Sequence, residues 1–407
     1  MNRIILIGNG FDLAHGFKTS YEDFIDWYWE YRVHGFQGNL GYISEDPLCK
    51  IEIVDRIECW NVFDFYLPRH FNKMPGKDII QSIIDTPSRF KVEFCPFFEK
   101  IITDVEKKGW VDIEDIYYAF LKSSEDPKQI NDDLEFIKEK LVEYLITLEE
   151  SSPNPIIQKQ ILEPISKEDI AIGAMDKWNE MLKKRIDYKE NEWRNLMDGY
   201  MRWEDSNFVQ SYEVFNILHG GPIRFGNIDS IDATSFPIIR LPDNIMMLNF
   251  NYTNTADLYL PKADKFSVNH IHGSLTKPES IIFGYGDERD DEYDTLMKKN
   301  DNEYLRHIKS FRYLDASNYR KMLAFIESEP YQLCIMGHSC GLSDRTLLST
   351  LFEHPNCVSI KPYYYRKEDG TDNYRELVQN IARNFSDPRL MRDRVVGKER
   401  CEALGVK

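Results

Sequence analysis

The stretch NRIILIGNGFDLAHGF, residues 2–17, is the part of the sequence that decides the fold. Residues 2–8 are short and almost continuously apolar, which is typical of a buried strand in a parallel sheet. Gly8 and Gly10 follow directly, and residues 20–32 then predict a helix. Glycines between a strand and a helix let the backbone approach a phosphate. The stretch therefore predicts a nucleotide-binding loop, with an ordinary tight turn as the alternative.

Strand-like runs return after residue 243 and alternate with helical runs. We expect strands at 245–250, 267–271, 280–283, 331–337 and 357–365, and helices at 315–327, 343–353 and 372–384. Strands alternating with helices favour a parallel sheet with helices on both faces. The fold class predicted is α/β, with a discontinuous, Rossmann-like parallel sheet that begins at the first strand and is completed by the last third of the chain.

The region between these two parts has a different character. It contains few strand-like runs and many amphipathic segments, with helices expected at 97–121, 131–148 and 170–203. We therefore expect a large α-helical insertion. The predicted organisation is a nucleotide-binding domain made of 1–32 and 235–390, an insertion domain at 33–234 and a C-terminal tail at 391–407.

Composition narrows the class of protein. The net charge is −17, which argues against broad binding to nucleic acid or to an anionic membrane. No apolar run is long enough to span a membrane, and the first apolar run is too short for a signal peptide. The seven cysteines include no C-x-x-C pair, so we expect reduced thiols and no metal site. A cytoplasmic location is the resulting prediction.

Two further motifs would lie where open α/β sheets bind ligands, at strand ends. In NFNYTN, residues 249–254, Asn251 can both donate and accept hydrogen bonds, with an Asx-type turn as the alternative. In HIHGS, alternation along the strand would put His270 and His272 on one face, towards a cleft. A structural role for these histidines is the alternative.

The sequence GHSCG at 337–341 fits the G-x-S-x-G nucleophile elbow, so a Ser339 hydrolase is one hypothesis. Only His354 follows Ser339, which leaves little room for the later strands that deliver the acid and the base. The other reading is a second nucleotide-holding turn in which Ser339 and Asp344 contact ribose or phosphate. In WVDIE at 110–114, Asp112 is interpreted as a helix cap rather than a catalytic acid.

Several of these segments together resemble one family. GNGFDLAHGFKTSYEDF at 8–24 looks like the N-terminal signature of the AbiH family of phage abortive-infection proteins, and four shorter motifs fit the same pattern in order: WVDIE at 110–114, NFNYTNT at 249–255, IHG at 271–273 and IMGHSCGLSD at 335–344. The order also resembles that of sirtuin-like NAD-handling folds, whose motifs match Gly8-Asn9-Gly10, Asn251, His272-Gly273-Ser274, Phe283-Gly284 and Gly337 with Ser339.

The resemblance implies a phage-defence effector that binds NAD and hydrolyses its nicotinamide glycosidic bond. Only nine residues separate Gly273 from Phe283, so the zinc module of the sirtuin deacylases cannot fit. Catalysis would then rest on Asn251 to position ribose and water, His272 as general base and Asp12 to stabilise positive charge. The expected NAD-binding residues are Gly8, Asn9, Gly10, Phe11, Asn249, Thr253, Gly337, Ser339 and Asp344.

The expected partners are a nucleotide ligand, a phage-derived trigger and further copies of the chain. A second hypothesis keeps the pocket but removes catalysis. In that case the protein is a sensor, in which a bound nucleotide changes how the insertion contacts a partner.

Overall fold

The first strand lies at the centre of a five-stranded parallel sheet whose order is β6-β5-β1-β7-β8. The computed structural model describes residues 1–38, 43–54, 74–108, 112–148, 152–185, 187, 240–259, 265–290 and 292–406. The strands of this sheet are β1 (Asn2–Ile7), β5 (Ile245–Asn249), β6 (Phe266–His270), β7 (Tyr331–Met336) and β8 (Cys357–Tyr363). The predicted parallel α/β sheet is thus confirmed, and its two parts lie far apart in the sequence.

The register brings the carboxyl ends of the strands to one edge. Ile5 lies opposite Met247 of β5 on one side and Cys334 of β7 on the other. Every residue of β1 is buried, which is why the apolar run is continuous rather than alternating. The loops that follow β1, β5 and β7 therefore meet at the same edge of the sheet.

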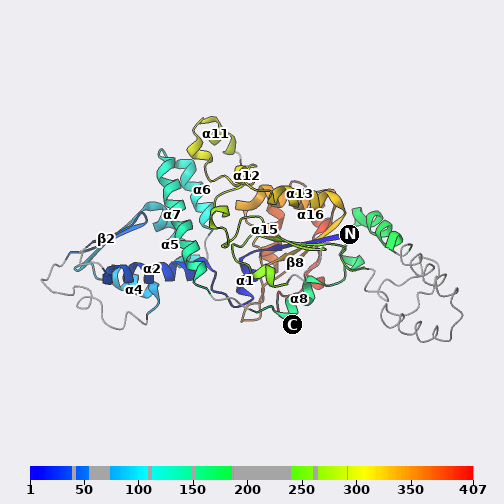
Figure 1. Cartoon of the computed structure of the whole chain (residues 1–407), viewed down its shortest axis with the longest axis horizontal. Coiled ribbons are helices and arrows are strands. Elements are labelled where there is room, and N and C mark those ends of the chain that lie inside the picture. The colour runs from blue at the N-terminus through cyan, green and yellow to red at the C-terminus, as the bar shows by residue number, and fades with distance from the viewer. Residues whose placement is uncertain are drawn as a thin grey trace.

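Helices cover both faces of the sheet (Figure 1). Ile4 and Leu6 pack on one face against α13 (Asn318–Ser328), α14 (Arg345–Glu353) and α15 (Tyr374–Arg383). Ile5 and Ile7 pack on the other face, against α1 (Asn9–Leu13) and α8 (Pro155–Ile161). Helices α13, α14 and α15 were predicted from the sequence, whereas α1 was not.

The second large body lies beside the sheet, on the left in Figure 1. Its helices are α2 (Tyr21–Gly38), α4 (Gly76–Ile84), α5 (Pro96–Lys108), α6 (Ile113–Ser123) and α7 (Pro127–Ile146). It also contains an antiparallel sheet of β2 (Ile43–Glu45), β3 (Cys49–Ile53) and β4 (Phe90–Phe94). The described part of the insertion is mostly helical, as expected, and it also carries a small sheet whose strands were not predicted individually.

Three other local expectations need correction. The strand expected at 280–283 does not form; Ile281 and Phe283 are buried but pair with no strand. The helix expected at 97–121 is two helices, α5 and α6, separated near Asp112. Of the helix expected at 170–203, residues 175–185 are helical, and residues 188–203 lie outside the described residues.

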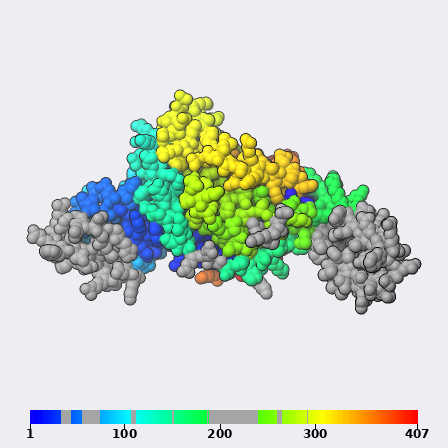
Figure 2. Space-filling view, viewed as in Figure 1, coloured from blue at the N-terminus to red at the C-terminus, as the bar shows by residue number. Residues whose placement is uncertain are grey.

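The two bodies exchange segments. Tyr285 and Ile308, which follow the third strand of the parallel sheet, belong to the core of the helical body. Between them lies α11 (Tyr293–Lys298), and α12 (Lys309–Arg312) follows Ile308 directly. Figure 2 shows this yellow segment against the cyan helices. In the other direction, Ile157 of α8 packs on the parallel sheet. The domain boundaries given above stay a prediction.

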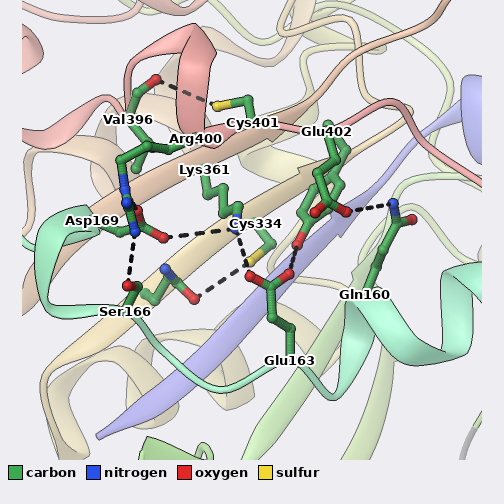
Figure 3. Close-up of polar contacts among 12 residues, drawn as sticks. Gln160, Glu163, Ser166, Asp169, Cys334, Lys361, Val396, Arg400, Cys401 and Glu402 are labelled. Carbon is green, nitrogen blue, oxygen red and sulfur yellow. Dashed lines mark hydrogen bonds and ion pairs between the residues drawn. The ribbon is translucent and has the colours of Figure 1, made fainter. Parts of the chain in front are cut away.

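The C-terminal tail is folded and fixed to the sheet. It contains α16 (Pro388–Arg394), and Tyr364 forms a parallel bridge to Ala403. In β8, Lys361 donates to Glu163 at 2.7 Å and lies 3.7 Å from Asp169. Arg400 of the tail donates to the same Asp169 at 2.6 Å (Figure 3). We call Lys361, Glu163, Asp169 and Arg400 the tail cluster.

Candidate functional site

A cavity of about 780 Å³ opens at the carboxyl ends of β1, β5 and β7. Its wall comes from the loops after these strands and after β6, from the end of β8, from helices α2, α6, α7 and α15, and from Leu404–Val406 of the tail. Ligands of open α/β sheets bind at this edge, and the volume lies in the range of small-molecule sites. The cavity is therefore the candidate functional site.

Three glycines bring the loops after β1 and β7 into direct backbone contact at the cavity. A Cβ on Gly8 would lie 2.5 Å from Cα of His338, and one on Gly10 would lie 2.9 Å from Cα of Gly337. Gly337 has φ of +81°, and its Cβ would lie 2.0 Å from the backbone nitrogen of Phe11. Close packing of the two loops therefore requires glycine at these three positions, independently of any bound phosphate.

Asp12 connects the first loop to the loop after β5. It is 1% exposed, and its Oδ2 accepts a hydrogen bond of 2.6 Å from the Thr253 hydroxyl. Its other oxygen, Oδ1, is buried with no hydrogen-bond partner among the described residues. Burial raises the pKa of this carboxyl, and the Thr253 hydrogen bond opposes that shift. Asp12 therefore lines the cavity with one oxygen unsatisfied.

Asn251 fixes the relative position of the two loops. Its amide Nδ2 donates to the Gly8 carbonyl at 3.0 Å, and its side chain lines the cavity. Asn249 has a different place: it is fully buried, and its Nδ2 donates to the Thr253 carbonyl at 3.0 Å, closing the turn. Asn249 does not line the cavity, and neither does Phe11, which packs into the core.

The two histidines of the HIHGS motif separate. Strand β6 ends at His270, so the alternation expected for this pair does not continue to His272. His270 contacts Asp257 at 3.0 Å and Asn249 at 3.2 Å, away from the cavity. His272 is 4% exposed and lines the cavity. Only one of the two therefore reaches the candidate site.

A fully buried lysine organises the inner end of the cavity. Lys309 Nζ donates to Asp344 Oδ1 and to Glu114 Oε2, each at 2.8 Å. Burial alone would lower the pKa of this ammonium, but Asp344 and Glu114 raise it above its ordinary value. Burial alone would raise the pKa of Asp344, but Lys309, His272 and His338 together hold it well below its usual range. The inner end thus holds a charged pair, Lys309 and Asp344.

Asp344 also lies between two imidazoles. Its Oδ1 is 3.2 Å from His272 Nε2, and its Oδ2 is 3.6 Å from His338 Nε2. The Tyr313 hydroxyl is 3.1 Å from the same nitrogen of His272. Burial, followed by the Lys309 charge, lowers the pKa of His272. A neutral imidazole that can take up a proton is therefore the expected state near pH 7.

Glu114 is a part of the site contributed by α6. Its Oε1 accepts from the Gly284 backbone N–H at 3.0 Å. Burial raises the pKa of Glu114 to about 8. Asp112 caps α6 by accepting from the Asp115 N–H at 3.1 Å, as predicted, and it also lines the cavity. Trp110 and Val111 of this motif lie outside the described residues.

Ser339 lines the cavity, but among the described residues no histidine hydrogen-bonds to its hydroxyl. His354, the one histidine after it, contacts Glu327 at 3.3 Å and does not line the cavity. Positive φ in this turn falls on Gly337 and Cys340, not on Ser339. The geometry of the described residues therefore lacks the serine–histidine contact of a nucleophile elbow.

Sequence reasoning missed three members of this site: Lys309, Tyr313 and His338. His338 stood in a quoted motif, but nothing in the sequence marked it as a neighbour of Asp344. Lys309 lies in no recognised motif, and its partner Glu114 is 195 residues away in the chain.

A comparison with family models matches residues 4–365 to the family described as bacteriophage abortive infection AbiH. The chain belongs to the AbiH family. The match spans the loop after β1, the helical body and the residues around Asp344, and it includes the whole parallel sheet except the first two residues of β1. No curated protein and no solved structure matches this AbiH-family chain significantly.

The described residues contain no group of three or more His, Cys, Asp or Glu side chains arranged to hold a metal ion. None of the helices described is long and apolar enough to cross a membrane. The polar groups that line the cavity carry the function proposed for this AbiH-family protein.

Proposed function

We propose that this AbiH-family protein acts in abortive infection by binding NAD in the cavity and hydrolysing its nicotinamide glycosidic bond. The observation that carries the proposal is the meeting of His272, Asn251 and Asp12 around one cavity at the carboxyl ends of the strands. Numbered along the chain, the strand order is 3-2-1-4-5, the order of Rossmann-like dinucleotide-binding sheets. Both features favour a dinucleotide ligand.

The cavity offers neutral donors rather than cations for the diphosphate. Asn9, Ser339 and Ser343 line it with side chains that can donate to phosphate oxygens. The Gly10 N–H donates to the Gly337 carbonyl at 2.9 Å, so the loop backbone is partly engaged within the protein. Phosphate binding would therefore rest on these side chains and on the backbone amides that remain.

In the proposed reaction the bond between C1′ of the ribose and the nicotinamide nitrogen breaks, and its electron pair goes to the ring nitrogen. The oxygen of a water bonds to C1′, and His272 accepts the proton that this water loses. Asn251 would orient the ribose and the water. The Asp12 carboxylate would stabilise the positive charge that develops on the sugar, an electrostatic role for which a buried oxygen without a partner is suited.

Incubation of the purified protein with NAD, followed by chromatography of nicotinamide, tests the proposal. We expect His272→Ala to slow release by about 10²–10⁴-fold, the usual loss on removal of a general base. His354→Ala is the matched control, since His354 lies outside the cavity. Equal release by wild type and His272→Ala would refute the mechanism, and absence of both release and NAD binding would refute the ligand.

A nucleotide sensor is the second candidate function. It is favoured by the composition of the wall, since Leu141 and Leu145 of α7 and Glu114 of α6 line the same cavity as the sheet loops. A ligand in this position would touch both bodies of the protein. Saturable NAD binding without nicotinamide release, together with a ligand-dependent change in assembly, would favour this candidate over the enzyme.

A further inference from the structure

We propose that Lys309 is a positioning residue which, through Asp344, keeps the proton of His272 on Nε2 and leaves Nδ1 as the nitrogen that accepts a proton. The catalytic meaning of this inference rests on the proposed function. The location of the proton itself does not depend on NAD, so it can be tested separately.

The first step of the argument is the contact between Asp344 and His272. Asp344 Oδ1 lies 2.8 Å from Lys309 Nζ and 3.2 Å from His272 Nε2. The adjacent ammonium favours the ionised carboxylate, and an ionised carboxylate can only accept hydrogen bonds. The group facing Asp344 must therefore be a donor, which places the proton of neutral His272 on Nε2. The Tyr313 hydroxyl, 3.1 Å from the same nitrogen, then accepts rather than donates.

The second step concerns the other nitrogen of His272. A neutral imidazole has one donor and one acceptor nitrogen. In the part of the chain that the structure describes, no group hydrogen-bonds to Nδ1, and the ring lines the cavity. Nδ1 is therefore an acceptor with no protein partner, which is what a general base towards a bound hydroxyl or water requires.

His338 provides an internal comparison. Its Nδ1 accepts from the Cys340 backbone N–H at 2.9 Å, so its proton also lies on Nε2, 3.6 Å from Asp344 Oδ2. The same carboxylate thus faces the Nε2 atoms of both rings. The rings differ in the opposite nitrogen, which is used by the backbone in His338 and is without a protein partner in His272. This difference selects His272 as the base.

The third step is the fixed position of Lys309. Its side chain is fully buried, its backbone N–H donates to the Tyr285 carbonyl at 2.8 Å, and Glu114 accepts from Nζ opposite Asp344. The ammonium is therefore held between the helical body and the sheet loops. Asp344, Lys309, Glu114, His338 and Tyr313 are the titratable groups that face His272 or its carboxylate partner.

Nitrogen NMR on the full chain with ¹⁵N-labelled histidine tests the inference, with His272→Gln to assign the signals. In the wild type at pH 7 we expect His272 to carry its proton on Nε2. A proton on Nδ1 would overturn the proposal, and this result needs no other variant to fold. Failure of the protein to bind or cleave NAD would leave the spectrum fully interpretable.

Variants of Asp344 and Lys309 then test the roles of these two residues separately. Asp344→Asn presents an amide that can donate to Nε2, so we expect the His272 proton to move towards Nδ1. Lys309→Met removes a positive charge, so the pKa of His272 should rise by about 1 unit. Lys309→Arg should restore the lower value. Lys321→Met, at an exposed site on α13, is the control. An unchanged His272 pKa in folded Lys309→Met would overturn the role of Lys309.

Discussion

Two buried lysines in this protein each lie between two carboxylates, but in different surroundings. Lys309 has Glu114 and Asp344, both at 2.8 Å, and Asp344 reaches His272 at the cavity. Lys361 has Glu163 at 2.7 Å and Asp169 at 3.7 Å, and Arg400 of the tail completes that cluster (Figure 3). One arrangement ends at an imidazole that lines a cavity, and the other ends at Arg400, in the short 3₁₀ helix Lys398–Arg400 of the tail.

The comparison separates the stability that a buried ion pair contributes from the role that the neighbouring groups give to it. Removal of Lys309 leaves Asp344 as a buried charge without its lysine, whereas removal of Lys361 leaves Asp169 paired with Arg400. In the tail cluster the neighbour that lines the cavity is Tyr363, which donates to Glu163 at 3.1 Å, whereas the pair at Lys309 has the imidazole of His272 as its next neighbour. The same ionic arrangement therefore serves structure in the tail cluster and, by our proposal, proton placement at the cavity.

The largest expected effect is on folding. Lys309→Met should lose about 3–5 kcal/mol in the free energy of unfolding, since it leaves the buried Asp344 carboxylate without its lysine. Lys361→Met should lose less, because Asp169 keeps Arg400 at 2.6 Å and Glu163 is 31% exposed. Denaturant unfolding of both variants beside wild type measures this. An equal loss in the two variants would contradict this difference between the pairs.

The next effect distinguishes them. Asp344→Asn should lower nicotinamide release by about 10²-fold, because misplacement of a reacting group costs on that order. Asp169→Asn, the corresponding change in the tail cluster, should leave the turnover of folded protein close to wild type. Steady-state rates at matched folded concentration compare them, and equal losses would show that both carboxylates act through stability alone.

Two helix caps sharpen the comparison further. Asp112 caps α6, which carries Glu114, and Asp387 caps α16 near the tail by accepting from the Arg389 N–H at 2.8 Å. Replacement of either by Ala should cost about 0.5–2 kcal/mol. Calorimetry gives the stability and titration with NAD gives the affinity. Only Asp112→Ala should also weaken NAD binding, and a loss of affinity in Asp387→Ala would argue against that distinction.

The smallest effect is in pH dependence. Burial raises the pKa of Glu114 to about 8, so the folded state binds this proton more tightly than the unfolded chain does. The resulting stability is complete below the unfolded value near 4.5 and is lost as pH rises towards 8. Glu114→Gln should therefore show a shallower fall of melting temperature across this interval. A slope identical to that of the wild type would contradict the prediction.

The strands of the parallel sheet could be predicted because burial on both faces leaves a plain signal. Residues 245–249 and 331–336 are buried throughout, which matches their continuous apolar sequence. The same signal misled at 280–283, where Ile281 and Phe283 are buried in irregular backbone. In β3 and β4 the alternation of CKIEI and FKVEF was available, but short alternating runs were outweighed by the helical pattern around them.

The candidate site was predictable only where its residues follow strands. Asp12, Asn251 and His272 come directly after strands, and the fold rule for parallel sheets places such residues at one edge. Lys309 and Tyr313 enter from a segment that belongs partly to the helical core, and no local pattern marks their distant partners. Glu114 stands in the quoted WVDIE motif, but that motif was interpreted only through the helix cap at Asp112.

The central place of β1 also constrains how a cell makes this protein. Its two neighbours in the sheet begin at residues 245 and 331, so β1 is synthesised well before either of them. At about 5–20 residues per second, the ribosome needs roughly 16–65 s to travel from the end of β1 to the end of β7. Until β5 is made β1 has neither neighbour, and until β7 is made it lacks one. The nascent chain therefore depends on the helical body or on a chaperone to shield it, and no functional cavity exists before synthesis is nearly complete.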